Sequence, residues 1–297
     1  MAIKKVAIVG SGFLGAKIAL RSAMKGYPVS MYDIDRTALR KAKEMQENEL
    51  SIRVKNKTLP EQEKTIIQSR IKDTSSLIDA VIDADLVIEA IPEKVELKRN
   101  IFKEIDKASP AHTIIASNSS SIRVSLVENA CMRPEKVLNL HFYDPLKQST
   151  IVDIMRGTRT SDDTIVQVIE FVKGLEVTPL LVKKESTGFL FNRVWRAIKK
   201  ETLHLVDDGV GSFEDVDRAW MIMYDRSVGP FGMMDRIGLD VVRDIELVYY
   251  SESGDASDYP PMLLLDMVES GDLGVKTGKG FYSYPNPAYQ DPEWLKG

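Results

Sequence analysis

The stretch that decides the fold is KVAIVGSGFLGAKIALRSAMKGYPVSMYD, residues Lys5–Asp33. It opens with four apolar residues, Val6–Val9, a run typical of a buried parallel strand. The glycine-rich turn Gly10–Gly15 follows at once, and apolar residues then recur at helical spacing. A second apolar run, Val29–Tyr32, ends on an acidic residue. This order of strand, glycine turn, helix, strand and acid predicts a dinucleotide-binding unit.

The glycines of this turn have separate predicted roles. Gly10 permits the tight turn, Gly12 lets backbone N–H groups approach a pyrophosphate, and Gly15 lets the helix pack closely on the strand. Phe13 and Leu14 lie within the turn, and the N-terminus of the helix that follows adds partial positive charge that favours phosphate. These five residues are therefore the predicted phosphate-binding part of the cofactor site.

Asp33 lies 18 residues beyond Gly15, where an acid can accept hydrogen bonds from an adenosine ribose. Its carboxylate would repel a 2′-phosphate, so the predicted cofactor is NAD and not NADP. Arg36 points the other way, because an arginine just past the acid can bind that phosphate. A glycine turn alone is weak evidence, but its place between two strands makes the dinucleotide interpretation strong.

Length and composition restrict the class of protein. The 297 residues can form one large or two ordinary domains, and 43% hydrophobic with 28% charged residues is a soluble globular composition. The net charge of −4 argues against nucleic-acid and membrane-surface partners. The single cysteine, Cys131, excludes an internal disulfide and fits a reducing cytoplasm. No run of apolar residues is long enough to span a membrane, and no metal site is predicted.

Strands and helices alternate over the first part of the chain, which predicts an α/β fold with a doubly wound, mostly parallel, Rossmann-like sheet. Glu89, Ser117 and His141 each fall at the end of a predicted strand, where such sheets bind ligands. Asp144 and Pro145 then break the chain, and a further strand follows too soon for a helical crossover, so it should run antiparallel. The predicted strands are Val6–Val9, Val29–Tyr32, Ile71–Asp73, Ala84–Ala90, Thr113–Ala116, Val137–His141, Ile151–Met155 and Val177–Val182.

Beyond Lys183 the predicted strands disappear and only helices follow. We therefore expect an NAD-binding domain over residues 1–184 and a smaller all-helical domain over 185–297. In the first domain, the charged stretch from Thr37 to Gln68 predicts two solvated helices that project from the sheet. The predicted helices of the second domain are Asn192–Val206, Phe213–Met223, Val241–Tyr250 and Met262–Glu269.

Of the three histidines, His141 is the candidate base. His112 and His204 are expected to be structural or solvated. If the hairpin after His141 is centred near Lys147, residue 141 faces Asp153 closely enough for the side chains to meet. A carboxylate on one imidazole nitrogen fixes the tautomer and leaves the other nitrogen to act as a base. An ordinary buried histidine is the alternative.

The chain resembles the L-3-hydroxyacyl-CoA dehydrogenase family over nearly its whole length. The blocks that carry the resemblance occur in the family's order and spacing. They are VAIVGSGFLGAKIA (6–19), ADLVIEAIPEKVELK (84–98), IIASNSSS (114–121), HFYDP (141–145), TGFLFNRV (187–194), VGPFGMMDRIGLD (228–240) and GVKTGKGFYSY (274–284). The resemblance implies NAD-dependent hydride transfer in fatty acid metabolism. It also implies a helical domain that forms the substrate cleft and most of a homodimer interface.

The resemblance implies roles for individual residues. It makes His141 the base and Asp153 its acidic partner. It gives Ser120 and Asn192 the binding of the reacting oxygen or the orientation of the substrate. The residues implied to contact the cofactor are Glu93, Lys98 and Asn118.

The sequence departs from the family pattern near the candidate base. The family's acid is usually glutamate, whereas Asp153 is one methylene shorter. The family's HFFNP is HFYDP here, with Tyr143 and Asp144, and the following stretch 146–150 is more polar than usual. The positions that contact CoA in the family fall at about Glu49 and Asn56, with Lys55 and Lys57 beside them.

Three functions remain open on this sequence. The leading hypothesis is an NAD-dependent dehydrogenase of a 3-hydroxyacyl-CoA. A free hydroxy acid is the alternative substrate, because the polar residues near His141 suit a carboxylate. A cofactor-binding protein without catalysis is the third, and the presence of His141, Ser120, Asn192 and Asp153 argues against it.

Overall fold

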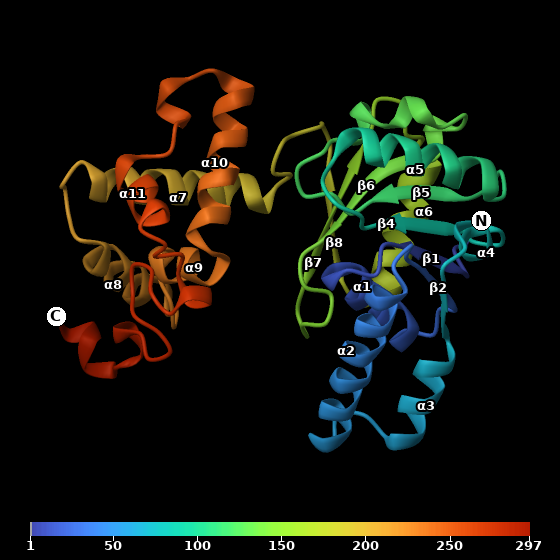
Figure 1. The fold of residues 1–297 in the computed structure, drawn as a ribbon, viewed down its shortest axis with the longest axis horizontal. Helices are drawn as coiled ribbons and strands as arrows, with labels where there is room; N and C mark the ends of the chain where they lie inside the picture. Colours follow the sequence, from blue (N-terminus) through green and yellow to red (C-terminus); the bar gives the residue numbers. More distant parts are fainter. Residues whose placement is uncertain (1) are drawn as a thin grey trace. The chain divides into compact units, whose positions relative to one another are not determined.

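The computed structural model describes residues 2–297, and the chain divides into two compact units, Met1–Leu190 and Phe191–Gly297. The first unit holds the sheet and the second is built from helices (Figure 1). The predicted fold class, a doubly wound sheet followed by a helical unit, is confirmed. The division lies a few residues after the boundary predicted from the sequence.

The sheet has eight strands in the order β3-β2-β1-β4-β5-β6-β7-β8. Neighbouring strands are parallel throughout, except that β7 runs antiparallel to β6. The antiparallel return predicted from the short connection is therefore confirmed. The strands are β1 Val6–Val9, β2 Val29–Tyr32, β3 Ile71–Thr74, β4 Leu86–Glu89, β5 Ile114–Ser117, β6 Val137–Phe142, β7 Ile151–Arg156 and β8 Thr178–Val182.

Both faces of the sheet are covered, so its central strands β1, β4, β5 and β6 are buried along their whole length. Side chains alternate between the faces of a strand, and β1 shows the result. Val6 and Ile8 join a core with residues of α1, α2 and α6, whereas Ala7 and Val9 join a second core with residues of α4 and α5. The helices of this unit are α1 Phe13–Met24, α2 Arg36–Lys55, α3 Glu61–Ser69, α4 Leu77–Val81, α5 Val95–Ala108 and α6 Asp162–Gly174.

Helices α2 and α3 extend away from the sheet as a pair (Figure 1), as the charged sequence predicts. The short helix α4 was not predicted. It has five residues and begins where the Ser76 hydroxyl accepts a hydrogen bond from the Asp79 amide at 3.3 Å. Five residues are too few for a helical period to appear in the sequence.

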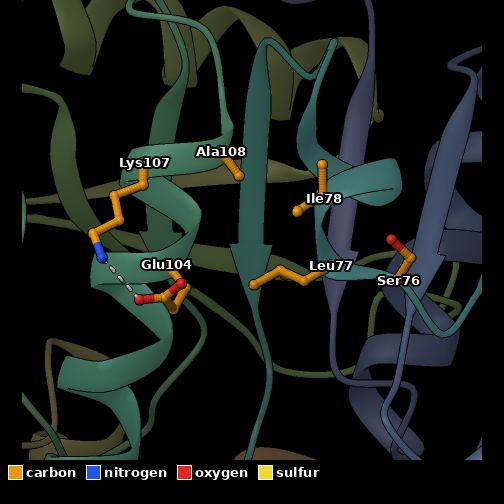
Figure 2. Close-up of a pocket in the computed structure, with 6 residues that line it drawn as sticks. All are labelled: Ser76, Leu77, Ile78, Glu104, Lys107 and Ala108. Carbon is orange, nitrogen blue, oxygen red and sulfur yellow. Dashed lines mark hydrogen bonds and ion pairs between the residues drawn. The ribbon is translucent and has the colours of Figure 1, made fainter.

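A hollow of about 450 Å³ lies between α4 and α5. Figure 2 shows Leu77 and Ile78 on one side and Ala108 on the other. Its charged groups, Glu104 and Lys107, bond to each other at 3.3 Å. This hollow offers apolar side chains and a neutralised ion pair, so it has no group suited to binding phosphate or activating a substrate.

Two buried carboxylates link segments of the helical unit that are far apart in the sequence. Asp217 accepts hydrogen bonds from the backbone amides of Phe231 and Gly232 at 2.8 and 2.9 Å, and from the Tyr282 hydroxyl at 3.0 Å. Asp235 likewise accepts from the amides of residues 281 and 282 and from the Tyr284 hydroxyl. Burial raises the pKa of Asp217 to about 6, against the opposing effect of these donors.

These carboxylates explain a helix that the sequence did not reveal. Helix α9 starts at Pro230 and contains Gly232, a residue unfavourable inside helices. Its N-terminal amides bond to Asp217 of another helix, and that tertiary contact replaces a local cap. The helices of this unit are α7 Phe191–Asp207, α8 Phe213–Tyr224, α9 Pro230–Ile237, α10 Leu239–Ser253 and α11 Met262–Glu269.

Candidate functional site

The turn between β1 and α1 is built by very close backbone contacts. Gly10 has φ of 107°, and a Cβ there would lie 2.6 Å from the Ala90 carbonyl oxygen. A Cβ on Gly15 would lie 2.0 Å from the Gly10 carbonyl oxygen. No side chain fits at either position without displacing backbone, so these two glycines are required by the fold.

Gly12 differs, because a Cβ there would meet no heavy atom within 4 Å in the described chain. The space beside it is open, and the first turn of α1 has neither an acidic residue nor a side-chain cap. Phe13 is 72% exposed, and a hollow of about 270 Å³ runs from the turn to α2. Open space beside uncapped N–H groups at a helix N-terminus fits a pyrophosphate.

Asp33 lies directly after β2 and is held against the glycine turn. One carboxylate oxygen accepts hydrogen bonds from the Ser11 amide at 2.8 Å and the Ser11 hydroxyl at 2.9 Å. The other accepts from the Asp35 amide at 3.0 Å. A carboxylate has about four acceptor positions, so these three bonds orient the group and leave capacity for a ribose hydroxyl.

Glu93 accepts hydrogen bonds from the serine loop, residues 119–121, which follows β5. Its carboxylate accepts hydrogen bonds from the Ser119 hydroxyl at 2.6 Å and the Ser120 amide at 2.9 Å. Burial opposes ionisation, but the nearby Lys98 ammonium and these hydrogen bonds outweigh it and lower the pKa of Glu93. The predicted substrate-binding serine is therefore positioned by a predicted cofactor residue.

Lys98 is 1% exposed, and its ammonium lies 2.6 Å from Glu89 and 3.2 Å from Glu93. The structure thus gives it a positioning role towards two carboxylates, and its contact with a cofactor stays a prediction. Asn118 is also buried, and its side-chain oxygen accepts a hydrogen bond from the Phe142 amide at 2.9 Å. This bond ties the serine loop to the end of β6, beside the candidate base.

His141 and Asp153 are paired directly across β6 and β7, as the predicted register requires. Both are buried, with exposures of 5% and 0%. His141 Nδ1 lies 3.9 Å from Asp153 Oδ2, which is too long for a hydrogen bond. That oxygen instead accepts a hydrogen bond from the Tyr143 hydroxyl at 2.6 Å.

Two aromatic rings fix the plane of the His141 imidazole. The Phe189 ring stacks on it with centroids 4.9 Å apart and planes 3° apart. Tyr143 meets it edge-on with centroids 4.6 Å apart. Phe189 has φ of 54°, an uncommon backbone conformation for a residue with a side chain, and this conformation is frequent at functional sites.

An ion pair joins helix α1, which follows the glycine turn, to the loop that follows the candidate base. Lys17 of α1 lies 3.1 Å from Asp144, which follows β6 three residues after His141. The same ammonium lies 4.1 Å from the Phe13 ring centroid. Because parallel strands end at one edge of a sheet, the turn after β1 and the end of β6 share that edge, and this contact shows how close they are.

The structure therefore brings most of the predicted site residues of the first unit to one edge of the sheet. Asn192 lies in the first turn of α7, in the helical unit. The sequence reasoning missed Phe189, Lys17 and the hydroxyl of Tyr143. Their signals were the aromatic residue in the TGF block, a lysine on the first helix, and the tyrosine that replaces phenylalanine in HFYDP.

The sheet order, the glycine turn and the acid after β2 define a dinucleotide-binding protein of the dehydrogenase class. Residues 5–186 match the family model of the 3-hydroxyacyl-CoA dehydrogenase NAD binding domain, and residues 188–284 match that of its C-terminal domain. The chain therefore belongs to the 3-hydroxyacyl-CoA dehydrogenase family, whose members are NAD-dependent oxidoreductases.

Several relatives match almost the whole chain. A probable 3-hydroxybutyryl-CoA dehydrogenase of Bacillus subtilis is 33% identical over 96% of this chain and 98% of its own length. The crystal structure of (S)-3-hydroxybutyryl-CoA dehydrogenase from Ralstonia eutropha is 35% identical, with a TM-score of 0.90 over 96% of this chain and 100% of that one. A diketoreductase structure, described as acting on dicarbonyl compounds, is 31% identical, with a TM-score of 0.84 and the same coverage of both chains.

Gly12 and Gly15 form a matched pair for a first test. Gly12→Ala should leave the melting temperature within a few degrees of the parent and weaken NAD binding, because the methyl group enters only the space for the pyrophosphate. Gly15→Ala should lower the melting temperature strongly, because its Cβ meets backbone. Thermal unfolding and fluorescence titration with NAD measure both effects. Normal NAD affinity in Gly12→Ala would contradict the assignment.

Proposed function

We propose that this protein oxidises the 3-hydroxyl group of a 3-hydroxyacyl-CoA to a ketone with NAD, or catalyses the reverse reduction. The observation that carries the proposal is the pairing of His141 with Asp153 at the edge of the sheet that also holds the glycine turn. Family membership and the names of the relatives support the same activity. NAD, when bound, accepts the hydride.

In the proposed reaction, His141 takes the hydroxyl proton at Nε2, because Nδ1 is the ring nitrogen that faces Asp153. The buried carboxylate stabilises the imidazolium that results. Stacking on Phe189 holds the ring plane while the proton moves. In the reduction, the imidazolium returns the proton to the carbonyl oxygen from the same atom.

Ser120 and Asn192 are proposed to bind the reacting oxygen. Ser120 is exposed, its amide donates a hydrogen bond to Glu93 at 2.9 Å, and its hydroxyl makes only a long one, at 3.4 Å, to the same carboxylate oxygen. Asn192 is half-buried in the first turn of α7. A hydroxyl and a side-chain amide both donate hydrogen bonds that favour the negative charge developing on oxygen.

A CoA thioester needs cationic or neutral donors near its phosphates, and the end of α2 with the turn after it is the proposed source of them. Glu49, at a position that contacts CoA in the family, lies 2.7 Å from Arg53 of the same helix, so its charge is neutralised. The Arg53 guanidinium also donates to the Leu146 carbonyl oxygen at 2.9 Å. Lys55 and Lys57 at the end of α2 are exposed and able to reach phosphate.

A free hydroxy or keto acid is the second candidate substrate. The segment 146–150 after the HFYDP block is polar, and Lys147 within it is exposed and suited to a carboxylate. The similarity to a diketoreductase acting on dicarbonyl compounds adds support, because that relative covers the same share of both chains as the Ralstonia enzyme, although with a lower TM-score. A CoA ester should need the lysines at the end of α2, whereas a free acid should not, and this difference allows a direct test.

Homodimer formation through the helical unit and a cytoplasmic location also remain proposals. Exposed apolar side chains on α7 and α8 support the dimer, because monomers seldom leave many large apolar groups in water. They include Val194, Ile222, Met223 and Tyr224. The location rests on the single buried cysteine. Among residues 2–297, no helix combines the length and apolar character needed to cross a bilayer.

NAD should bind at least tenfold more tightly than NADP. The Asp33 carboxylate is held in place by Ser11 and would repel a 2′-phosphate. Parallel titrations of both cofactors at one ionic strength measure the ratio. Asp33→Ala should reduce the ratio of NAD affinity to NADP affinity. If the parent bound NADP as tightly as NAD or more tightly, the attraction of Arg36 for the 2′-phosphate would outweigh the repulsion from Asp33.

His141→Ala should lower kcat by roughly a hundredfold to ten-thousandfold, the range of general-base catalysis, with NAD affinity near that of the parent. Asp153→Asn should also slow turnover, since an amide does not stabilise an imidazolium. Steady-state kinetics and NAD titration separate the two effects. His112→Ala is the matched control, because His112 bonds to Asp85 at the opposite end of the strands. Parent-like turnover by His141→Ala would rule out the base.

Lys55→Ala with Lys57→Ala should raise KM for 3-hydroxybutyryl-CoA several-fold and leave kcat for a truncated thioester unchanged. The reason is that both lysines are proposed to bind the CoA phosphates and to have no contact with the reacting carbon. Turnover of 3-hydroxybutyryl-CoA, free 3-hydroxybutyrate and other hydroxy acids is compared in the same assay. The control is Lys103→Ala, an exposed lysine on α5. Faster turnover of a free acid than of any CoA ester would favour the second candidate.

A further inference from the structure

The hydroxyl of Tyr143 is bonded to the acid that faces the proposed base. It donates to Asp153 Oδ2 at 2.6 Å, while His141 Nδ1 lies 3.9 Å from that same oxygen. Within residues 2–297, neither His141 Nδ1 nor Asp153 Oδ1 has a hydrogen-bond partner. The tyrosine therefore holds the oxygen that the histidine would otherwise use.

We infer that Tyr143 is a positioning residue for the proposed reaction: its hydroxyl holds the Asp153 carboxylate and limits how strongly that carboxylate stabilises protonated His141. This inference rests on the proposed role of His141 as the base. A carboxylate that accepts a short hydrogen bond shares its negative charge with the donor. Less of that charge then acts on the imidazole.

The side-chain lengths explain why a second donor is needed here. The carboxylate of Asp153 stands on one methylene group, and in this register it stops short of Nδ1. A fully buried carboxylate without a donor is costly, and Tyr143 supplies that donor from the loop after β6.

Among the described residues of the first unit, the recorded neighbours of His141 and Asp153 are largely apolar or aromatic. On the β8 side, Asp153 is paired with the apolar Leu180. On the other side, Phe189 covers the face of the imidazole. The loop after β6 adds Asp144, whose charge is paired with Lys17 at 3.1 Å. Tyr143 and Asp153 are thus the polar groups that face the imidazole most directly.

The consequence is a measurable effect on the pH dependence of oxidation. Tyr143→Phe removes the donor, leaves the ring, and returns the full carboxylate charge to His141. Protonated His141 is then favoured, and oxidation needs the neutral imidazole. The acid limb of the kcat/KM profile should therefore move to higher pH by about 0.5 to 1 unit. A tyrosine that merely fills space would leave this limb where it is.

Nuclear magnetic resonance supplies a readout that does not depend on turnover. The chain has three histidines, so the imidazole signals of the free protein are few, and His141→Ala identifies the relevant one. In Tyr143→Phe, the pH at which the His141 signal changes should rise by the same amount as the kinetic limb. Tyr27→Phe is the matched control, because Tyr27 packs on Phe171 away from this site and should change neither measurement.

Asp153→Glu tests the geometry independently. The added methylene should let the carboxylate reach Nδ1 directly, so Tyr143→Phe should have little further effect in that background, and the two substitutions should be non-additive. An unmoved or lowered midpoint in Tyr143→Phe would overturn the inference. The inference would also be overturned if Tyr143→Phe shifted the midpoint equally in the parent and in the Asp153→Glu variant. If His141→Ala retains activity, the proposed function itself fails, and this result is distinct from the other two.

Discussion

The candidate site depends on the reversal of chain direction between β6 and β7. In the antiparallel register, His141 lies opposite Asp153, and the neighbouring pairs join Phe142 to Val152 and residue 140 to Ile154. A slip of one residue would place an apolar side chain opposite the imidazole and turn the acid to the other face of the sheet. The apolar partners on both sides therefore protect the pairing of the acid with the proposed base.

The same constraint creates an electrostatic problem that the surrounding residues resolve. The register buries Asp153 completely, and a buried carboxylate requires donors or a cation. In this protein the donor is the hydroxyl of Tyr143, which belongs to the short loop between β6 and β7. The loop itself is held from outside the sheet by Lys17 and Arg53, which contact Asp144 and Leu146. Helices α1 and α2 thus support the acid indirectly.

Much of this could be predicted from the sequence, because the responsible signals are local. Apolar runs located the strands, and the eight residues between β6 and β7 were too few for a crossover, which determined the antiparallel direction. The register followed only when the hairpin was assumed to be centred near Lys147, and the structure confirms it. Helix α9 was missed because its cap, Asp217, comes from a different helix. The stacking of Phe189 on His141 was also missed, because these two residues are far apart in the sequence and meet only in the folded chain. The burial of Lys98 against Glu89 was also missed, because it depends on how α5 packs on the sheet, and the contact of Lys98 with a cofactor stays a prediction.

The two buried carboxylates of the helical unit have a consequence for its cooperativity. The segment 281–284 supplies both amides and hydroxyls that Asp217 and Asp235 accept. If this segment separated from the unit, both carboxylates would lose hydrogen-bond donors, and this penalty would add to the cost of exposing the segment's own buried aromatic rings. Fraying from this part of the chain is therefore opposed at its first step. The unit should open as a whole, with residues far apart in sequence losing protection against hydrogen exchange together.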